Sequence, residues 1–307
     1  MRITIGIATY LRPQGLSQTL EGVRALSLPE ECELHLVIAD NDDQGSAEAL
    51  CASQEASFPF PLHYLKVEQR GISFVRNQIA RYAISLQSAF LAFLDDDEIP
   101  DSRWLCELLA IQDTCQADLV GGPVIRVFPE GTPAWNSRLC FFEARQEPGG
   151  LSSRNIDCGN ALVAISVFTQ NKLFFDEDFA LTGGEDAMFS VFARRSGLVT
   201  AWADRARVFE TVPSDRLRIP WLLSRSFRVG TVTVMVERRL FSLEVMILRN
   251  TSKVLIYFAA GVVAGLASCG VSPYQKRRSL IFLSRSAGLV CGLFGLRQEG
   301  YRRTTGG

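Results

Sequence analysis

The sequence predicts an α/β fold in which a mostly parallel sheet is flanked by helices. Apolar, β-branched runs alternate with segments of helical periodicity through the first hundred residues, which is typical of parallel strands with helices on both faces. Polar residues gather where these runs end: Thr9 and Tyr10 after the first, Asp40 at the end of the second, and four acids from residue 95 onward. Because ligands bind beyond the carboxyl ends of the strands in such sheets, these ends predict a binding site.

The predicted elements follow one another in order along the chain. From the periods of their apolar residues, strands are expected at residues 2–9, 33–40, 62–68 and 89–97, and helices at residues 15–26 and 71–86. Beyond residue 100 we expect a helix at 103–112, an extended segment at 117–128, a strand at 160–168, a loop and helix at 183–197, and a strand at 199–210. A change to basic and apolar composition divides the chain into a domain of residues 1–215 and a helical region of residues 216–307.

The charge of the chain is distributed unevenly between these two parts. Hydrophobic residues make up 47% of the sequence, which excludes a disordered chain. Residues 1–215 hold 17 Lys and Arg against 30 Asp and Glu, whereas residues 216–307 hold 15 against 3. A basic and apolar region favours an anionic membrane surface as its partner. It is too apolar for a typical nucleic-acid-binding arm, so no nucleic acid is expected. Eight scattered cysteines without a C-x-x-C pair predict neither a disulfide framework nor a zinc site.

Two apolar stretches indicate how the basic region meets a membrane. Residues 254–271 carry no charge over 18 positions, which is the lower limit for a spanning helix. If this stretch and residues 279–296 spanned as a hairpin, the loop with Lys276, Arg277 and Arg278 would violate the positive-inside tendency. We therefore favour segments that lie in, or dip into, the cytoplasmic face of the plasma (inner) membrane. A single span, or helices packed on the soluble domain or on a second subunit, are the alternatives. The absence of a signal peptide before the first strand agrees with a cytoplasmic location.

Four acids, Asp95, Asp96, Asp97 and Glu98, directly follow a buried strand. Adjacent carboxylates repel one another and resist leaving water unless a partner compensates their charge. A divalent cation such as Mg²⁺ or Mn²⁺ is a suitable partner, since it is commonly held by one or two carboxylates together with substrate phosphates. Because side chains alternate along a strand, Asp95 and Asp97 should point the same way and Asp96 the opposite way. A solvated acidic turn before the next helix is the alternative.

These motifs together resemble a known family. Six motifs occur in the order found in the family 2 inverting glycosyltransferases. They are IATYLRP near the start, VIADND at the second strand, GISFVRNQIA, FLDDDE, the turn CGN at residues 158–160 and GGEDAMF. The resemblance extends from about residue 2 to about residue 230 and is strongest to the bacterial members that build exopolysaccharide or other surface glycans. It implies the nucleotide-sugar-binding GT-A fold for residues 1–215, the catalytic domain.

The resemblance implies a donor-binding role for residues at the first three motifs. Thr9 and Tyr10 would line the pocket for the nucleobase and ribose, and Asp40 would accept a hydrogen bond from the base. The base is commonly uracil in this family, so a UDP-sugar is the expected donor. Gly71 would permit close approach of the backbone, and Arg76 would lie beside the nucleotide. A surface salt bridge is the alternative for Arg76.

The resemblance also implies the metal-binding and catalytic residues. Asp97 would be the main ligand of Mn²⁺ or Mg²⁺ and bridge to the diphosphate, and Asp95 would face the ribose or the metal. Asp96 belongs to the same donor-binding motif. Asp186 would be the general base that takes the proton of the acceptor hydroxyl, which inverting transfer requires, and Glu185 would orient the acceptor. A helix start at which both acids simply favour the positive end of the dipole is the alternative.

The basic segment after residue 216 leaves two interpretations open. Arg225 or Arg228 could approach the diphosphate or a lipid-linked acceptor, or the helix that carries them could face lipid. The Q-x-x-R-W signature of processive synthases is missing, which favours transfer of a single sugar over polymerisation.

The sequence thus predicts a metal-dependent glycosyltransferase that moves one sugar from a nucleotide-diphospho-sugar to a glycan or a polyprenyl- or other lipid-linked acceptor. A D-x-D phosphohydrolase is a less favoured alternative, because that class expects its motif near the first strand. A non-catalytic, membrane-associated binding module with the same fold is the other alternative, and the acids at Asp97 and Asp186 argue against it.

Overall fold

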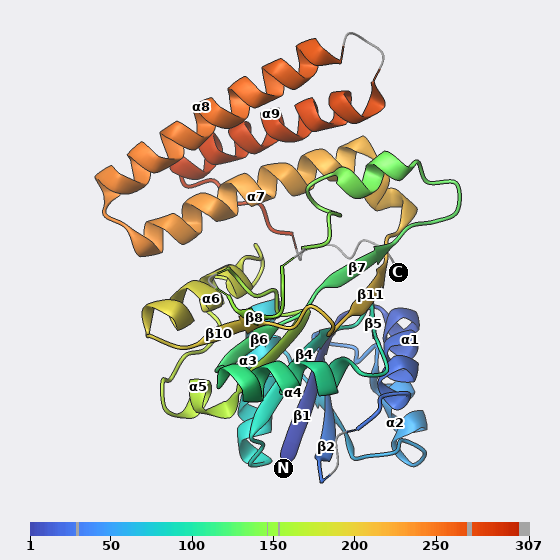
Figure 1. Ribbon diagram of the computed structural model, residues 1–307. Helices are drawn as coiled ribbons and strands as arrows, with labels where there is room; N and C mark the ends of the chain where they lie inside the picture. Colours follow the sequence, from blue (N-terminus) through green and yellow to red (C-terminus); the bar gives the residue numbers. More distant parts are fainter. Residues whose placement is uncertain (29–30, 146, 153, 269–271, 301–307) are drawn as a thin grey trace.

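An eight-stranded sheet forms the centre of the protein (Figure 1). The computed structural model describes residues 1–28, 31–145, 147–152, 154–268 and 272–300. The strand order of this sheet is β3-β2-β1-β4-β9-β6-β10-β8. Its strands are β1 (Arg2–Thr9), β2 (Glu33–Asp40), β3 (Leu62–Lys66), β4 (Phe90–Asp95), β6 (Leu119–Gly121), β8 (Gly150–Leu151), β9 (Asn160–Ala164) and β10 (Thr200–Trp202).

The first four strands of the sheet are parallel, and their carboxyl ends lie at the same level. Strand β1 pairs with β2 so that Thr9 is opposite Asp40, and with β4 so that Ala8 is opposite Asp95. Strand β9 is antiparallel to both β4 and β6. The register therefore brings the polar ends of β1, β2 and β4 to one edge of the sheet.

Helices cover both faces of this sheet, and each face has its own apolar core. Ile3, Ile5 and Ile7 of β1 pack with α1 (Pro13–Arg24), α2 (Glu48–Glu55) and α4 (Trp104–Cys115) on one face. The other face packs against α3 (Ile72–Ser85), α5 (Ile165–Thr169) and α6 (Glu185–Arg195). Both cores are buried because successive side chains of a strand point to opposite faces.

A second sheet of three strands lies beside the end of the large one. Its order is β5-β11-β7, with β5 (Glu98–Pro100), β7 (Val124–Val127) and β11 (Val208–Thr211). The register places Glu98, Glu210 and Arg126 in one row across the three strands. This sheet therefore sets one arginine and two acids next to the acidic end of β4.

Three long helices follow: α7 (Ile219–Leu240), α8 (Leu243–Ala267) and α9 (Pro273–Leu293). Helix α9 lies between the other two, and α7 is the one nearest the sheets (Figure 1). Glycines make the close contacts, since a Cβ on Gly288 of α9 would lie 2.1 Å from the carbonyl oxygen of Phe227 on α7. The described residues also form short 3₁₀ helices, which are η1 (Ala134–Arg138), η2 (Glu177–Phe179) and η3 (Ser214–Leu217).

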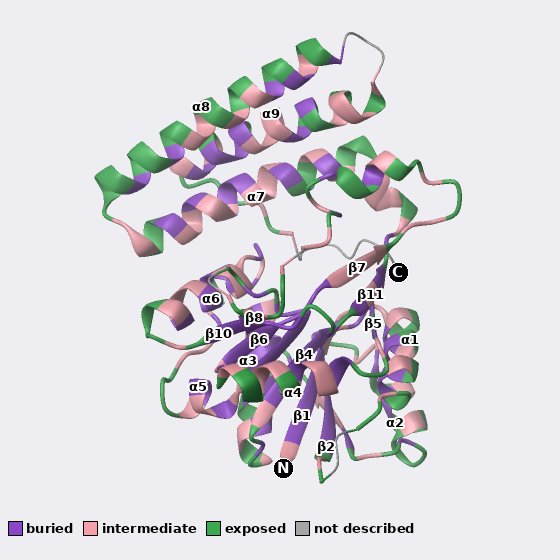
Figure 2. Cartoon of the chain, viewed as in Figure 1, coloured by how far each residue is buried: buried purple, intermediate pink, exposed green. Residues whose placement is uncertain are grey.

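Helix α8 is exposed along much of its length (Figure 2), and many of its exposed residues are large and apolar. Among the described residues it is the one helix long and apolar enough to cross a membrane, and only 17% of its most apolar stretch is buried. Leu248, Leu255 and Leu266 are 69%, 64% and 72% exposed. Core helices of soluble proteins can be as long and apolar as α8, but they are mostly buried. The exposure of α8 therefore distinguishes it from a core helix. The end of the apolar stretch predicted at residues 254–271 lies outside the described residues.

The predicted fold class is confirmed, with corrections in several segments. The strands predicted at residues 2–9 and 33–40 coincide with β1 and β2. The strand predicted at 160–168 is wrong in its second half, where the chain turns into α5. The strand predicted at 199–210 is two strands in different sheets, β10 and β11, and α2 was not predicted.

The contact between α7 and α9 generates a prediction about stability. Gly288→Ala would place a Cβ against the backbone of Phe227, which cannot rotate away, so the two helices must move apart. We expect the free energy of unfolding, measured by urea denaturation, to fall by about 1–3 kcal/mol. Gly265→Ala is the matched control, since its Cβ would meet only the side chain of Ser279, at 3.1 Å or more. Equal stability of the two variants would contradict the tight α7–α9 contact.

Candidate active site

A cavity of about 520 Å³ opens at the carboxyl ends of β1 and β4. Its walls come from both sheets, from α3 and α6, from the segment after η1 and from α7. Nine of the ten predicted site residues line it: Thr9, Tyr10, Gly71, Arg76, Asp95, Asp96, Asp97, Glu185 and Asp186. Residues from distant parts of the sequence thus meet where strand-end polarity predicts a site.

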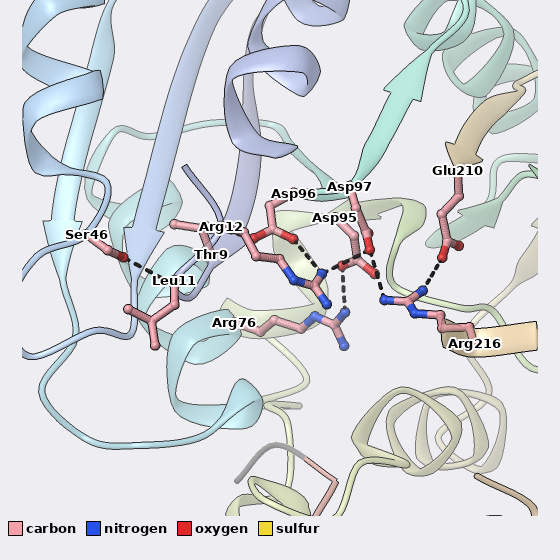
Figure 3. Close-up of polar contacts among 10 residues, drawn as sticks. All are labelled: Thr9, Leu11, Arg12, Ser46, Arg76, Asp95, Asp96, Asp97, Glu210 and Arg216. Carbon is pink, nitrogen blue, oxygen red and sulfur yellow. Dashed lines mark hydrogen bonds and ion pairs between the residues drawn. The ribbon is translucent and has the colours of Figure 1, made fainter. Parts of the chain in front are cut away.

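The acidic end of β4 is held by arginines and a hydroxyl (Figure 3). Thr9 donates from Oγ1 to Asp96 Oδ2 at 2.8 Å. Arg12 Nη1 lies 3.2 Å from Asp96 Oδ1 and 2.9 Å from Asp97 Oδ2, and Arg216 Nη2 lies 3.3 Å from Asp97 Oδ2. Burial and the charge of the neighbouring Asp97 together raise the pKa of Asp96 to about 7, against the opposing charge of Arg12. These arginines therefore offset the repulsion among the acids.

The predicted alternation of these acids is wrong beyond Asp95. Strand β4 ends at Asp95, and residues 96 and 97 form a turn. Because a turn does not keep the alternation of a strand, Arg12 reaches both Asp96 and Asp97.

Arg76 connects the end of β4 with the start of α6. Its Nη2 lies 3.1 Å from Asp95 Oδ1 and its Nη1 lies 2.5 Å from Glu185 Oε1. Arg76 is 5% exposed and Glu185 is 2% exposed, so the alternative of a surface salt bridge is wrong. Burial raises the pKa of Glu185 to about 7, and Arg76 limits the rise. A buried guanidinium therefore fixes two of the predicted acids relative to one another.

The row across the small sheet continues this charge network. Glu210 is paired with Arg126, and its Oε1 lies 2.5 Å from Arg216 Nη1. Glu98 is buried, and its Oε2 has no hydrogen-bond partner in the described part of the chain. Burial raises the pKa of Glu98 well above its ordinary value, and Asp95 and Asp97 add to the increase. The second sheet thus places a further acid directly behind the end of β4.

Asp40 does not line the cavity. It is fully buried, and its carboxylate accepts from the backbone N–H groups of Asp42 at 2.9 Å and Ala47 at 2.8 Å and from the Tyr64 hydroxyl at 3.2 Å. In the structure Asp40 orders the loop between β2 and α2. Its predicted contact with a base stays a prediction.

The neighbouring residue Asn41 shapes the end of the cavity instead. Its side chain donates to two backbone carbonyls and accepts from the Gly71 N–H at 2.7 Å. Gly71 has a φ of +132°, and a Cβ there would lie 2.5 Å from the Cβ of Ala180, so the position requires glycine. Beside it the Arg70 guanidinium stacks on the Tyr10 ring. This end combines an aromatic ring, a cation and amide groups, which suit a nucleoside.

Asp186 lies in the first turn of α6 and lines the cavity. Gly184 before it has a φ of +92°, and a Cβ there would lie 2.3 Å from Val232 of α7, so this turn packs closely on the C-terminal helices. Asp157 lines the same cavity. Partial loss of hydration and the charge of Asp186 raise the pKa of Asp157 to about 6. Two carboxylates of the same cavity, Asp157 and Asp186, therefore lie close enough to interact electrostatically.

Sequence reasoning missed one amide and several charged residues of the site. Arg12, Asn41, Arg126, Asp157, Glu210 and Arg216 line the cavity or its charge network. Arg12 and Asn41 stand inside motifs that were noted for other residues, IATYLRP and VIADND. For the others, no local pattern distinguishes them from surface charges.

The residues at the end of β4 fit a divalent cation. No group of three or more His, Cys, Asp or Glu side chains in the described ranges could by itself hold a metal ion. Arg76 occupies only Oδ1 of Asp95, and the two arginines occupy only Oδ2 of Asp97. Within the described ranges the second oxygen of each carboxylate makes no hydrogen bond to an arginine, and Mg²⁺ bound by two carboxylates and phosphates needs no third protein ligand.

Comparisons with known proteins agree with this geometry. Residues 4–171 match the model of the family described as Glycosyl transferase family 2. Succinoglycan biosynthesis protein ExoM of Rhizobium meliloti (strain 1021) is 30% identical over 313 residues, which cover 99% of this chain and 98% of that protein.

Two solved structures have a similar fold. Mannosyltransferase PcManGT from Pyrobaculum calidifontis, in complex with GDP-Man and Mn²⁺, gives a TM-score of 0.63 at 15% identity and covers 95% of this chain and 87% of that one. S. aureus TarS 1-349 gives a TM-score of 0.54 at 14% identity, with 96% and 92% of the two chains covered. These likenesses support a GT-A-like fold. Since the family model spans more than half of the sequence and ExoM matches along nearly all of it, this chain belongs to glycosyl transferase family 2 and is a glycosyltransferase.

Proposed function

We propose that this enzyme moves a single sugar, with inversion, from a nucleotide-diphospho-sugar to a glycan or lipid-linked acceptor during biosynthesis of a bacterial surface polysaccharide. The observation that carries the proposal is the cavity at the end of β4, where the acids and arginines of a diphosphate site adjoin Asp186. ExoM, named for succinoglycan biosynthesis, supports the polysaccharide assignment. TarS in complex with UDP and with UDP-GlcNAc supports a UDP-sugar as donor.

The nucleoside would occupy the end of the cavity at β1. Thr9 and Tyr10 line this end, and Gly71 allows the backbone to approach a ligand without a Cβ in the way. Asp40 would contact the base only if its loop opened, because its carboxylate already accepts bonds from that loop. Arg76 would lie beside the nucleotide while it holds Asp95 in place.

Asp97 and Asp95 would hold the cation, Mn²⁺ or Mg²⁺, against the donor diphosphate. When bound, such a cation stabilises the negative charge that develops on the leaving diphosphate. Arg12 and Arg216 would orient Asp97 by binding its other oxygen. Asp96, which accepts a hydrogen bond from Thr9, would fix the turn of residues 96 and 97.

Asp186 would act as the general base. Its carboxylate would take the proton from the acceptor hydroxyl as that oxygen attacks the anomeric carbon, and the nucleoside diphosphate would leave on the opposite side. A single displacement of this kind inverts the anomeric centre. Glu185 would support the base by holding the first turn of α6 through Arg76. Its predicted contact with the acceptor stays a proposal.

We place the enzyme at the cytoplasmic face of the membrane, attached through α8. The exposed apolar face of α8 and the exposed cations Lys276 and Arg278 at the start of α9 support this assignment. Family membership favours the transferase over the phosphohydrolase and over a non-catalytic module.

The metal assignment is tested by Asp97→Asn. A panel of nucleotide sugars with Mn²⁺ or Mg²⁺ is screened for release of nucleoside diphosphate, and we expect the variant to lose at least about 100-fold in turnover. The reason is that a neutral amide oxygen binds a divalent cation weakly. Asp113→Asn, an exposed acid outside the cavity, is the control and should match the unmodified enzyme. Metal-dependent turnover that survives Asp97→Asn would remove Asp97 from the site.

The catalytic base is tested by Asp186→Asn. This variant should bind UDP with the affinity of the unmodified enzyme in calorimetry, because Asp186 is not placed at the nucleotide. Its transfer rate should fall by about 10²–10⁴-fold, which is the contribution of a general base. If Asp186→Asn transfers sugar normally, another group takes the proton.

Attachment to the membrane is tested on two exposed leucines of α8. Replacing Leu248 and Leu255 together by Gln should lower co-sedimentation with vesicles of anionic phospholipid by at least about tenfold, since each buried leucine contributes about 1.5–3 kcal/mol. Leu151→Gln is the control, because Leu151 is equally exposed at 71% but lies on β8. Unchanged co-sedimentation of the α8 variant would argue that this face meets another partner.

A further inference from the structure

One face of α7 lines the active-site cavity. Trp221, Arg225 and Arg228 are spaced i, i+4 and i+7, which places them on one side of a helix, and all three line the cavity. Phe141 and Glu143, after η1, and Asp157, before β9, line it as well. These six residues, called the α7 subsite below, have no role in the donor site proposed above.

Arg225 differs from the arginines around the acids of the donor site. Arg12, Arg76, Arg126 and Arg216 each form an ion pair with a carboxylate. Arg225 is exposed and makes no hydrogen bond or ion pair with any residue that the structure describes. A guanidinium offers five N–H donors in a fixed plane. Its charge acts on Asp157 of the same cavity, but its N–H donors stay open to the acceptors of a ligand.

Trp221 provides a rigid aromatic surface one helical turn before Arg225. Its ring stacks on Phe142 at 6.0 Å between centroids and meets Phe141 edge-on at 6.2 Å. Phe142 is buried, whereas Trp221 is only half-buried. Large aromatic side chains with a polar neighbour are typical of ligand sites that bind one apolar face and several polar groups. The C–H face and the hydroxyls of a pyranose have this character.

The acids of the α7 subsite indicate a neutral ligand. Glu143 and Asp157 are both exposed to the cavity. They would repel a phosphate, but they accept hydrogen bonds from sugar hydroxyls, while Arg225 donates to hydroxyl oxygens. Asp157 and Asp186 line the same cavity, and the charge of Asp186 helps to raise the pKa of Asp157. The subsite therefore adjoins the proposed general base.

We propose that the α7 subsite binds a neutral pyranose of the acceptor glycan, with Trp221 beneath the ring and Arg225 as a specificity-determining contact. The inference rests on the proposed function and adds where the acceptor lies and which chemistry recognises it. Helix α7 thereby supplies residues that recognise the acceptor, and the GT-A-like domain supplies the donor site and the base.

The test measures glycoside binding separately from nucleotide binding. The full chain is loaded with UDP and Mn²⁺ and titrated with the p-nitrophenyl α- and β-pyranosides of glucose and galactose, and saturation-transfer NMR gives the affinity. Arg225→Ala should weaken the bound glycoside about fivefold, the loss of roughly one hydrogen bond. Trp221→Leu should weaken it by a similar factor. Arg218→Ala is the control, because Arg218 is exposed at the start of α7 but does not line the cavity. The affinity for UDP should stay unchanged in all three.

The outcomes separate the subsite from the proposed function. Weaker glycoside binding in Arg225→Ala with normal UDP binding supports the subsite, even if Trp221→Leu fails to fold. Glycoside binding that is unaffected by Arg225→Ala, or no glycoside binding to the UDP-loaded chain, overturns the subsite and leaves the donor site standing. Binding of pyrophosphate in place of glycosides, lost in Arg225→Ala, overturns the neutral assignment in favour of a phosphate. A chain that does not bind UDP overturns the proposed function and the subsite with it.

Discussion

The site depends on compensating the charge of the acids at the end of β4. Asp95, Asp96 and Asp97 follow a strand buried on both faces, and Glu98 behind them is buried. Carboxylates in this position repel one another and lose hydration, which is why the pKa of Asp96 is raised to about 7. The compensation comes from three arginines in distant parts of the sequence, Arg12, Arg76 and Arg216 (Figure 3). One local electrostatic requirement thus holds the start of α1, the helix α3 and the entry to α7 around a single cavity.

This balance also suits the proposed ligand. A divalent cation and a diphosphate bring charges that nearly cancel, so a donor–cation complex can enter without leaving either an acid or an arginine uncompensated. Arg76 and Arg216 each bind two carboxylates, Asp95 with Glu185 and Asp97 with Glu210. Each arginine can therefore keep one partner while the oxygens of the other turn to a ligand. A pair with only one carboxylate would not have this property, because a buried charge left alone costs several kcal/mol.

The sequence predicted the strands and site residues that a local pattern marks. It did not predict the residues whose role depends on contacts between distant parts of the chain. The strands β1 and β2 coincide with their predictions because each is an apolar run bounded by polar residues. The strand predicted at residues 160–168 failed because the apolar run continues into α5, and an apolar run alone does not separate a strand from a short helix. Strand-end position identified Thr9, Tyr10 and the four acids from Asp95 to Glu98, which all line the cavity. It did not identify Glu210, since its role comes from the register that sets it opposite Glu98 and Arg126. Asp40 has the expected position, but the loop that follows supplies its hydrogen-bond donors.

The C-terminal region predicted to begin at residue 216 is not separate from the cavity, because it supplies part of the cavity wall. Arg216 pairs with Asp97, and Gly184, just before the proposed base, packs on Val232 of α7. Helix α7 therefore forms a wall of the cavity, whereas α8 presents its apolar face outward on the far side of α9 (Figures 1 and 2). If the enzyme is attached through α8, at least one layer of helix separates its cavity from the lipid. The acceptor glycan would then extend from the membrane past α9 to reach α7, the helix that carries Trp221 and Arg225 in the wall of the cavity. With α8 as the proposed attachment, this distance from the membrane favours a subsite for a neutral sugar of the glycan over one for the phosphate that joins the glycan to lipid.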